Sequence, residues 1–199
     1  MSNSSPANPK QQYLKVDLSG YDTSAYDSGA GTLKMILWYY VNIFIFKSAW
    51  LPIMGIKRFL LKAFGAKLGE GVIIKPSVNI KYPWKLEIGN HVWIGEGVWI
   101  DNLEPVIIED NVCISQDALL LTGGHRISTT GFEYKSGKIH LEAGCWIGAR
   151  AVVARNVRCG THSILGISSV AQKDLEPYTV YKGNPASPVM QRQLTIDTK

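Results

Sequence analysis

The chain has 199 residues, of which 46% are hydrophobic and 19% are charged. This composition excludes a globally disordered chain and suits one folded domain, alone or with an added segment. The formal charge of +5 is a mild basic excess that fits anionic small molecules, phosphates or an anionic membrane surface. The basic residues are too scattered to indicate nucleic-acid binding, so no nucleic-acid partner is expected.

Residues 1–30 are rich in Ser, Asn, Gly, Asp and Tyr and predict an extended polar arm with little fixed structure. No basic stretch followed by an apolar one occurs in this arm, so we do not expect a secretory signal. The cysteines Cys113, Cys145 and Cys159 match no disulfide or metal-binding spacing. They predict core thiols in a reducing compartment, and therefore a cytoplasmic protein.

Residues 31–69 predict one or two helices with a break near Pro52, because apolar residues recur at helical spacing, as at Leu37 and Val41. The most apolar stretch, residues 35–46, has 12 residues. A bilayer requires about 20, so a buried or interfacial helix is expected. Basic residues follow beside further apolar ones, and peripheral contact with a membrane surface stays open as an alternative.

An aliphatic or small residue returns at every sixth position through most of residues 70–182. We call these positions the ladder residues. They are Ile74, Ile80, Ile88, Ile94, Ile100, Ile108, Ile114, Leu120, Leu141, Ile147, Val153, Cys159, Leu165 and Ala171. A small or β-branched residue stands four positions after most of them, and a Gly or an acidic residue directly follows many.

A period of six does not match the 3.6-residue period of an α-helix. It is satisfied by a chain that turns a corner every sixth residue, so that short parallel strands form the faces of a triangular prism around the ladder residues. We expect the recurrent glycines to serve the turns. The pattern predicts a mainly β protein, a parallel β-helix over residues 70–182, with a helical N-terminal segment and a C-terminal tail at 183–199.

The repeat is interrupted between Leu120 and Leu141, which predicts a loop over residues 123–139 beginning with Gly123-Gly124-His125. The two glycines would let the backbone approach a ligand closely. Histidine has an ordinary pKa near 6.5 and is well suited to accept a proton at neutral pH. On the residues alone, a polar loop histidine without a catalytic role is the more frequent interpretation.

Seven segments match those of a known family. They are DLSGY (17–21), RFLLKAFGAKLGEGV (58–72), KPSVNIKYPWKLEIGN (75–90), WIDNL (99–103), LLTGGH (120–125), CWIGARAVV (145–153) and VYKGNPA (180–186). With them the sequence resembles the hexapeptide-repeat acyltransferases, and in particular the colanic acid biosynthesis acetyltransferases. The last three segments are shared more widely, with maltose, galactoside and nodulation-type acetyltransferases.

The resemblance implies a left-handed β-helix, a homotrimer, acetyl-CoA bound in the groove between neighbouring prisms, and a sugar hydroxyl as acceptor, with no metal required. It implies His125 as the general base. Asn102 would orient the acceptor or contact the oxyanion, and a purely local turn role for it stays open. The residues implied for acetyl-CoA are Trp146, Gly148, Ala149, Ile167, Ser168, Gln172, Lys173, Lys182 and Arg192.

The expected function is therefore O-acetyl transfer from acetyl-CoA to a sugar in exopolysaccharide biosynthesis of the colanic acid type. One alternative is the same chemistry on another small acceptor, such as an antibiotic or an amino sugar. Another is a non-catalytic β-helix scaffold. The chain has Arg126 where the galactoside and maltose branch commonly has proline, and GEGVW (95–99) where that branch carries an Asn-containing stretch. Detailed acceptor contacts are therefore not transferred from that branch.

Overall fold

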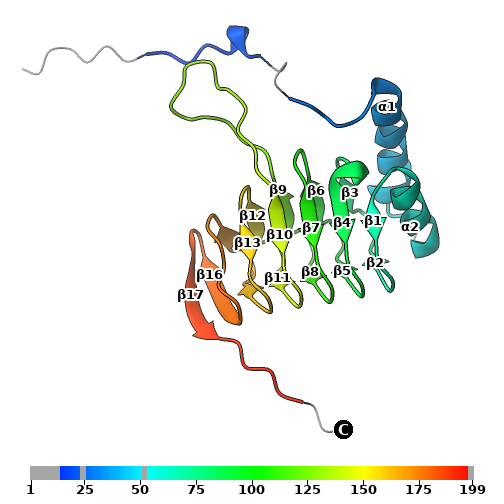
Figure 1. The fold of residues 1–199 in the computed structure, drawn as a ribbon, viewed down its shortest axis with the longest axis vertical. Helices are drawn as coiled ribbons and strands as arrows, with labels where there is room; N and C mark the ends of the chain where they lie inside the picture. The colour runs from blue at the N-terminus through cyan, green and yellow to red at the C-terminus, as the bar shows by residue number, and fades with distance from the viewer. Residues whose placement is uncertain (1–13, 23–25, 51–52, 197–199) are drawn as a thin grey trace, which may run out of the picture.

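The computed structural model describes residues 14–22, 26–50 and 53–196. Helix α1 (Thr32–Val41) continues into a π-helical segment (Asn42–Phe46), and α2 (Met54–Ala63) follows. The break expected near Pro52 lies outside the described residues. Short 3-10 turns occur at Leu18–Gly20 and Pro83–Lys85. From Lys67 onward the chain forms short strands, joined by turns and one long loop, that coil into a prism (Figure 1).

The strands form three sheets, which we call faces A, B and C. Face A holds β1 (Lys67–Leu68), β4 (Leu86–Ile88), β7 (Val106–Ile108), β10 (Ile139–Leu141) and β13 (Arg158–Cys159). Face B holds β2 (Ile73–Ile74), β5 (Trp93–Ile94), β8 (Cys113–Ile114), β11 (Trp146–Ile147), β14 (Ile164–Leu165), β16 (Thr179–Gly183) and β17 (Ala186–Gln191). Face C holds β3 (Asn79–Ile80), β6 (Trp99–Asp101), β9 (Leu119–Leu121), β12 (Val152–Ala154) and β15 (Val170–Ala171).

The chain visits faces A, B and C in turn, and neighbouring strands of a face belong to successive coils. All strand pairs are parallel except β16 with β17, which are antiparallel. Each of the fourteen ladder residues is at most 4% exposed, and ladder residues pair with ladder residues, as Ile94 does with Ile114. The predicted parallel β-helix with N-terminal helices is confirmed.

The glycines that follow ladder residues have a different physical role from the one expected. A Cβ atom on Gly95 would lie 2.8 Å from the backbone nitrogen of Gln116, and one on Gly148 would lie 2.7 Å from the carbonyl carbon of Gly166. Adjacent coils are thus too close for a side chain there. The left-handed turn positions are instead often taken by other residues, such as His91 and His162, each with φ 55°.

The two helices cover the end of the prism where the first coil begins (Figure 1). Trp38 is 2% exposed, packs against Phe46 and Phe64, and donates its indole N–H to the Ile80 carbonyl oxygen at 2.9 Å. Lys57 is fully buried and donates its ammonium to the Lys75 carbonyl oxygen at 2.9 Å. Burial lowers the pKa of Lys57. These contacts fix the helices to the first coil.

Two of the three cysteines, Cys145 and Cys159, are buried in the prism interior, as the sequence predicted. Burial raises the pKa of both thiols, so they stay protonated and unreactive at neutral pH. Cys113 is only partly buried in β8 on face B, so the prediction of a core thiol is wrong for this residue. Of the helices in the described part of the chain, none has the length and apolar content needed to cross a membrane.

Candidate functional site

The interruption of the ladder is a long loop at the edge between faces C and A. The chain leaves β9 after Leu121 and returns to the prism at Ile139, the first residue of β10. The two limbs of the loop are joined by backbone hydrogen bonds. The Lys135 N–H donates to the Gly124 carbonyl at 2.9 Å, and the Arg126 N–H donates to the Glu133 carbonyl at 2.8 Å. The loop therefore projects from the prism as a hairpin (Figure 1).

The two glycines at the start of this loop lie close to neighbouring side chains. A Cβ atom on Gly123 would lie 2.6 Å from a methyl carbon of Leu103, and one on Gly124 would lie 2.7 Å from the Arg155 guanidinium. This close packing holds the base of the loop against the prism, and His125 follows directly from it.

The His125 ring is held in a single orientation. Its Nδ1 lies 3.0 Å from the Phe132 carbonyl oxygen. A carbonyl oxygen only accepts hydrogen bonds, so this contact places the proton on Nδ1 and leaves the lone pair on Nε2. The ring stacks on Phe132, with ring centroids 4.1 Å apart, and makes an edge-to-face contact with Tyr21, with ring centroids 5.7 Å apart. The arrangement is suited to a general base acting through Nε2.

A cavity of about 460 Å³ opens beside His125. It is lined by residues of the loop, of two turns of the prism and of the N-terminal arm. The lining residues are Tyr21, Tyr26, Asp101, Leu103, Leu121, Gly123, Gly124, His125 and Tyr134. The mixture of aromatic rings, aliphatic side chains and a few polar groups is typical of a small-molecule site.

The N-terminal arm contributes Tyr21 and Tyr26 to this cavity, which sequence reasoning missed. The Asp17 N–H donates to the Thr130 carbonyl on the loop at 2.9 Å. The Lys85 ammonium donates to the Asp27 carbonyl at 2.7 Å. Partial burial raises the pKa of Tyr26 far above its ordinary value, so its hydroxyl stays protonated. The segment DLSGY, which includes Tyr21, was the available signal in the sequence.

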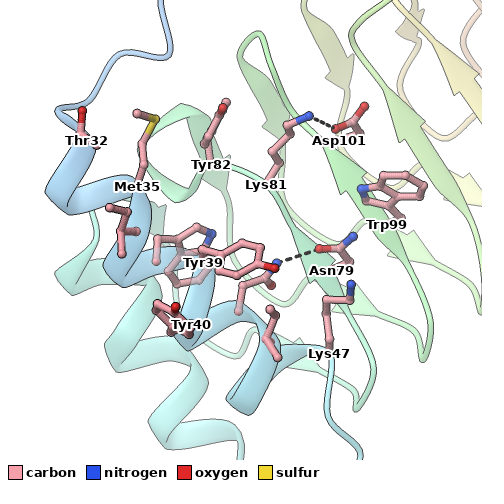
Figure 2. Close-up of a pocket in the computed structure, with 14 residues that line it drawn as sticks. Thr32, Met35, Tyr39, Tyr40, Lys47, Asn79, Lys81, Tyr82, Trp99 and Asp101 are labelled. Carbon is pink, nitrogen blue, oxygen red and sulfur yellow. Dashed lines mark hydrogen bonds and ion pairs between the residues drawn. The ribbon is translucent and has the colours of Figure 1, made fainter.

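A second, larger cavity of about 630 Å³ lies between α1 and face C (Figure 2). Tyr39 and Tyr40 come from α1, and Trp99 comes from β6. Asp101, whose carboxylate lies 3.2 Å from the Lys81 ammonium, lines both cavities and so marks where they adjoin. This cavity contains no histidine or cysteine, and we therefore place the candidate chemistry at His125.

Asn102 does not line the His125 cavity, although its neighbours Asp101 and Leu103 do. It is fully buried. Its side-chain oxygen accepts from the Tyr82 N–H at 2.9 Å, and its side-chain nitrogen donates to the Tyr82 carbonyl at 2.6 Å. The amide thus ties two adjacent coils together. A direct catalytic role for Asn102 stays a prediction.

The substitution Asn102→Ala separates the two roles. It would leave the backbone N–H of Tyr82 without a partner, while the Tyr82 carbonyl would still accept from the Lys85 N–H at 3.0 Å. We therefore expect the free energy of unfolding to fall by about 1–3 kcal/mol. Urea denaturation of the variant and the wild type measures this change. Unchanged stability together with a much lower kcat would instead show that the amide acts on the reacting groups.

Most of the residues predicted for acetyl-CoA lie at the edge between faces B and C. Gly148 and Ala149 follow β11, and Ile167 and Ser168 follow β14 one coil later. The Ser168 N–H donates to the Ala149 carbonyl at 2.9 Å. Lys182 lies in β16, the strand that pairs with β14 in the next coil. Ile167 is 72% exposed, and Trp146 is half-exposed on face B with its indole N–H donated to Ser115.

The other predicted acetyl-CoA residues lie at different edges. Gln172 and Lys173 follow β15, at the edge between faces C and A that also carries His125. Arg192 lies at the edge between faces A and B, where its guanidinium donates to the carbonyls of Gly144 and His162, each at 3.0 Å. A single prism therefore does not gather the nine predicted residues into one site.

The remaining histidines lie outside the cavity. His140 points outward from β10, with Nε2 2.7 Å from a Glu109 carboxylate oxygen, and His91 and His162 occupy turns. In the described ranges, no group of three or more His, Cys, Asp or Glu residues is arranged to hold a metal ion.

Solved structures of known proteins share this fold. The hexapeptide-repeat acetyltransferase of Vibrio cholerae, solved with acetyl coenzyme A, matches with a TM-score of 0.74 at 21% identity, over 83% of this chain and 92% of that one. A galactoside acetyltransferase solved with coenzyme A matches with a TM-score of 0.73 at 24% identity, over 81% and 82%. The fold is thus that of the hexapeptide-repeat acetyltransferases.

Comparison with known sequences shows which of the hexapeptide-repeat acetyltransferases this chain resembles. No family model matches the chain. WcaF, a colanic acid biosynthesis acetyltransferase of Escherichia coli K12, is 36% identical over 178 residues, which cover 88% of this chain and 97% of WcaF. The galactoside O-acetyltransferase of the same strain is 30% identical over 129 residues, 63% of this chain and 64% of that protein. The chain belongs to the family of colanic acid biosynthesis acetyltransferases.

Proposed function

We propose that the protein transfers an acetyl group from acetyl-CoA to a sugar hydroxyl in exopolysaccharide biosynthesis, with His125 as the general base. The observation that carries this proposal is the hydrogen-bond geometry of His125, whose protonated Nδ1 faces the Phe132 carbonyl and whose Nε2 carries the lone pair, on a ring that lines a cavity. Relatives named as acetyltransferases of colanic acid biosynthesis and of galactosides support the same chemistry.

In the proposed reaction, Nε2 of His125 accepts the proton of the acceptor hydroxyl as its oxygen attacks the thioester carbonyl carbon. The new C–O bond forms a tetrahedral intermediate with a negative oxygen. This intermediate collapses with cleavage of the C–S bond, and the departing CoA sulfur takes the proton from the imidazolium. Holding both substrates together lowers the barrier by roughly 7–11 kcal/mol.

We propose a homotrimer with acetyl-CoA in the groove between neighbouring prisms, in the cytoplasm. Two observations support this arrangement. The predicted acetyl-CoA residues lie at separate edges of one prism. A groove between two prisms would place one edge of the first prism beside a different edge of the second. Structures of the same fold hold acetyl-CoA or CoA. The His125 cavity is then the acceptor pocket, with Tyr21, Tyr26 and Tyr134 against the sugar ring.

Release of free CoA thiol from acetyl-CoA, measured against a panel of free, nucleotide-linked and lipid-linked sugars, tests the proposal. We expect thiol release that depends on a sugar. Amino sugars and antibiotics belong in the same panel, because activity restricted to them would establish the alternative acceptor class. No thiol release with any acceptor would indicate a non-catalytic scaffold.

The variant Tyr21→Ala extends this assay to the acceptor pocket. We expect the acceptor KM to rise about tenfold, equivalent to about 1.4 kcal/mol of lost binding, while the KM for acetyl-CoA stays unchanged. Val16→Ala is the matched control, since Val16 is an exposed arm residue outside the cavity. Equal effects of the two variants would contradict an acceptor contact by Tyr21.

A further inference from the structure

The helical segment carries a strongly one-sided charge. From Ser28 to Gly69 the sequence contains no Asp or Glu and six Lys or Arg residues. They are Lys34, Lys47, Lys57, Arg58, Lys62 and Lys67. The formal charge of these 42 residues alone is larger than the net charge of +5 of the whole chain. The basic excess of the protein is therefore concentrated on the helices at one end of the prism.

Two of these cations are free to meet an anion. Within the described ranges, neither Arg58 nor Lys62 lies within ion-pair distance of an acidic side chain. Lys57, in contrast, is buried against the prism, and Lys67 pairs with Glu87 at 2.8 Å. The unpaired cations lie on α2 among large exposed apolar side chains.

The outer side of α1 and of the π-helical segment is apolar. Leu33, Leu37, Tyr40 and Phe44 follow one another at spacings of four, three and four residues, which places them on one helix face. Each is more than half exposed. Trp38 lies on the opposite face and is buried against the prism. The rings of Tyr40 and Phe44 are stacked, with centroids 6.4 Å apart.

Exposed apolar side chains continue beyond this stripe. Trp50 is 67% exposed and Phe59 on α2 is 70% exposed. We define the helix outer surface as Leu33, Leu37, Tyr40, Phe44, Trp50, Ile56, Phe59, Arg58 and Lys62. Such a combination of aromatic and aliphatic side chains with unpaired cations is typical of helices that lie in a membrane interface.

We propose that the helix outer surface docks the protein onto an anionic phospholipid membrane. The continuous helical stretch from Thr32 to Phe46 is about 22 Å long and α2 about 15 Å. Both are shorter than the roughly 30 Å hydrocarbon core, so the helices lie on the membrane and do not cross it. The apolar side chains enter the acyl boundary, and Arg58 and Lys62 meet lipid phosphates. The absence of acidic residues removes the repulsion that would oppose this contact.

Sedimentation of the full chain with vesicles tests the proposal without acetyl-CoA or acceptor, so the outcome does not depend on the proposed activity. We expect binding to vesicles of phosphatidylcholine with phosphatidylglycerol, weak binding to phosphatidylcholine alone, and weaker binding at high salt. Arg58→Glu with Lys62→Glu should weaken binding at least about tenfold, as should Leu37→Ser with Phe59→Ser. Lys138→Glu and Ile196→Ser, exposed residues outside the surface, are the matched controls.

Circular dichroism and light scattering of each variant accompany the assay. Folded variants of unchanged mass that lose vesicle binding support the proposal. No binding of the wild type, or undiminished binding of both double variants, would overturn it. It would equally be overturned if the serine variant changed the oligomeric mass while vesicle binding stayed the same, because the surface would then be an interface between copies of this chain.

Discussion

The variant His125→Ala is expected to lower kcat by about 10²–10⁴-fold, because it removes the proposed general base for attack on the thioester. Its affinity for acetyl-CoA should stay close to that of the wild type, since we propose that the cavity beside His125 binds the acceptor and not acetyl-CoA. Steady-state thiol release gives kcat, and isothermal titration with acetyl-CoA gives the Kd.

The matched control is Ile127→Ala, two residues further along the same loop. Ile127 is 97% exposed and does not line the cavity, so its removal should change kcat by less than a few-fold. If His125→Ala kept kcat within the same few-fold range, His125 would not be the base. Loss of acetyl-CoA binding by His125→Ala would instead indicate that the loop had lost its structure.

The second large effect concerns stability. Ile108 is a ladder residue, 1% exposed in the prism interior, and Ile107 is its outward-facing neighbour in β7. Ile108→Ala is expected to lower the free energy of unfolding by about 2–5 kcal/mol, since the coils stacked on either side cannot close the cavity it leaves. Chemical denaturation at fixed protein concentration measures the change.

Ile107→Ala serves as the control, because it removes the same side chain from the same strand. We expect it to cost less than about 1.5 kcal/mol, since the Ile107 side chain is only partly buried. The two variants differ only in whether the truncated isoleucine points into or out of the prism. Equal losses from the two variants would mean that the ladder residue is not the one that carries the core.

The prism was predictable from the sequence because each coil must bury an inward-facing side chain in the same way. A buried side chain such as Ile94 needs the same neighbours one coil later, and the requirement recurs at a fixed spacing that is visible in one chain. The interruption was visible for the same reason. The role of the glycines was harder to infer. A glycine needed because two coils lie close together, as at Gly95 and Gln116, looks the same in the sequence as a glycine needed for a turn.

The candidate site was only partly predictable because it joins segments far apart in the chain. His125 stands at the break of the repeat, but Tyr21 is more than one hundred residues earlier, in a polar segment with no periodicity. Its contact with the loop depends on the path that the arm takes over the prism. The local partner of Asn102, the backbone of Tyr82, is likewise set by the stacking of adjacent coils.

The N-terminal arm has a consequence for how this enzyme family can diversify. Its described residues, 14–22 and 26–30, contribute none of the buried hydrophobic core, yet Tyr21 and Tyr26 form one wall of the cavity beside His125. Substitutions in the arm therefore escape the packing constraints that hold the prism sequence in register. If the cavity binds the acceptor as proposed, acceptor preference can drift, or be exchanged by transplanting this short segment between relatives, while the His125 loop and the folded scaffold stay the same.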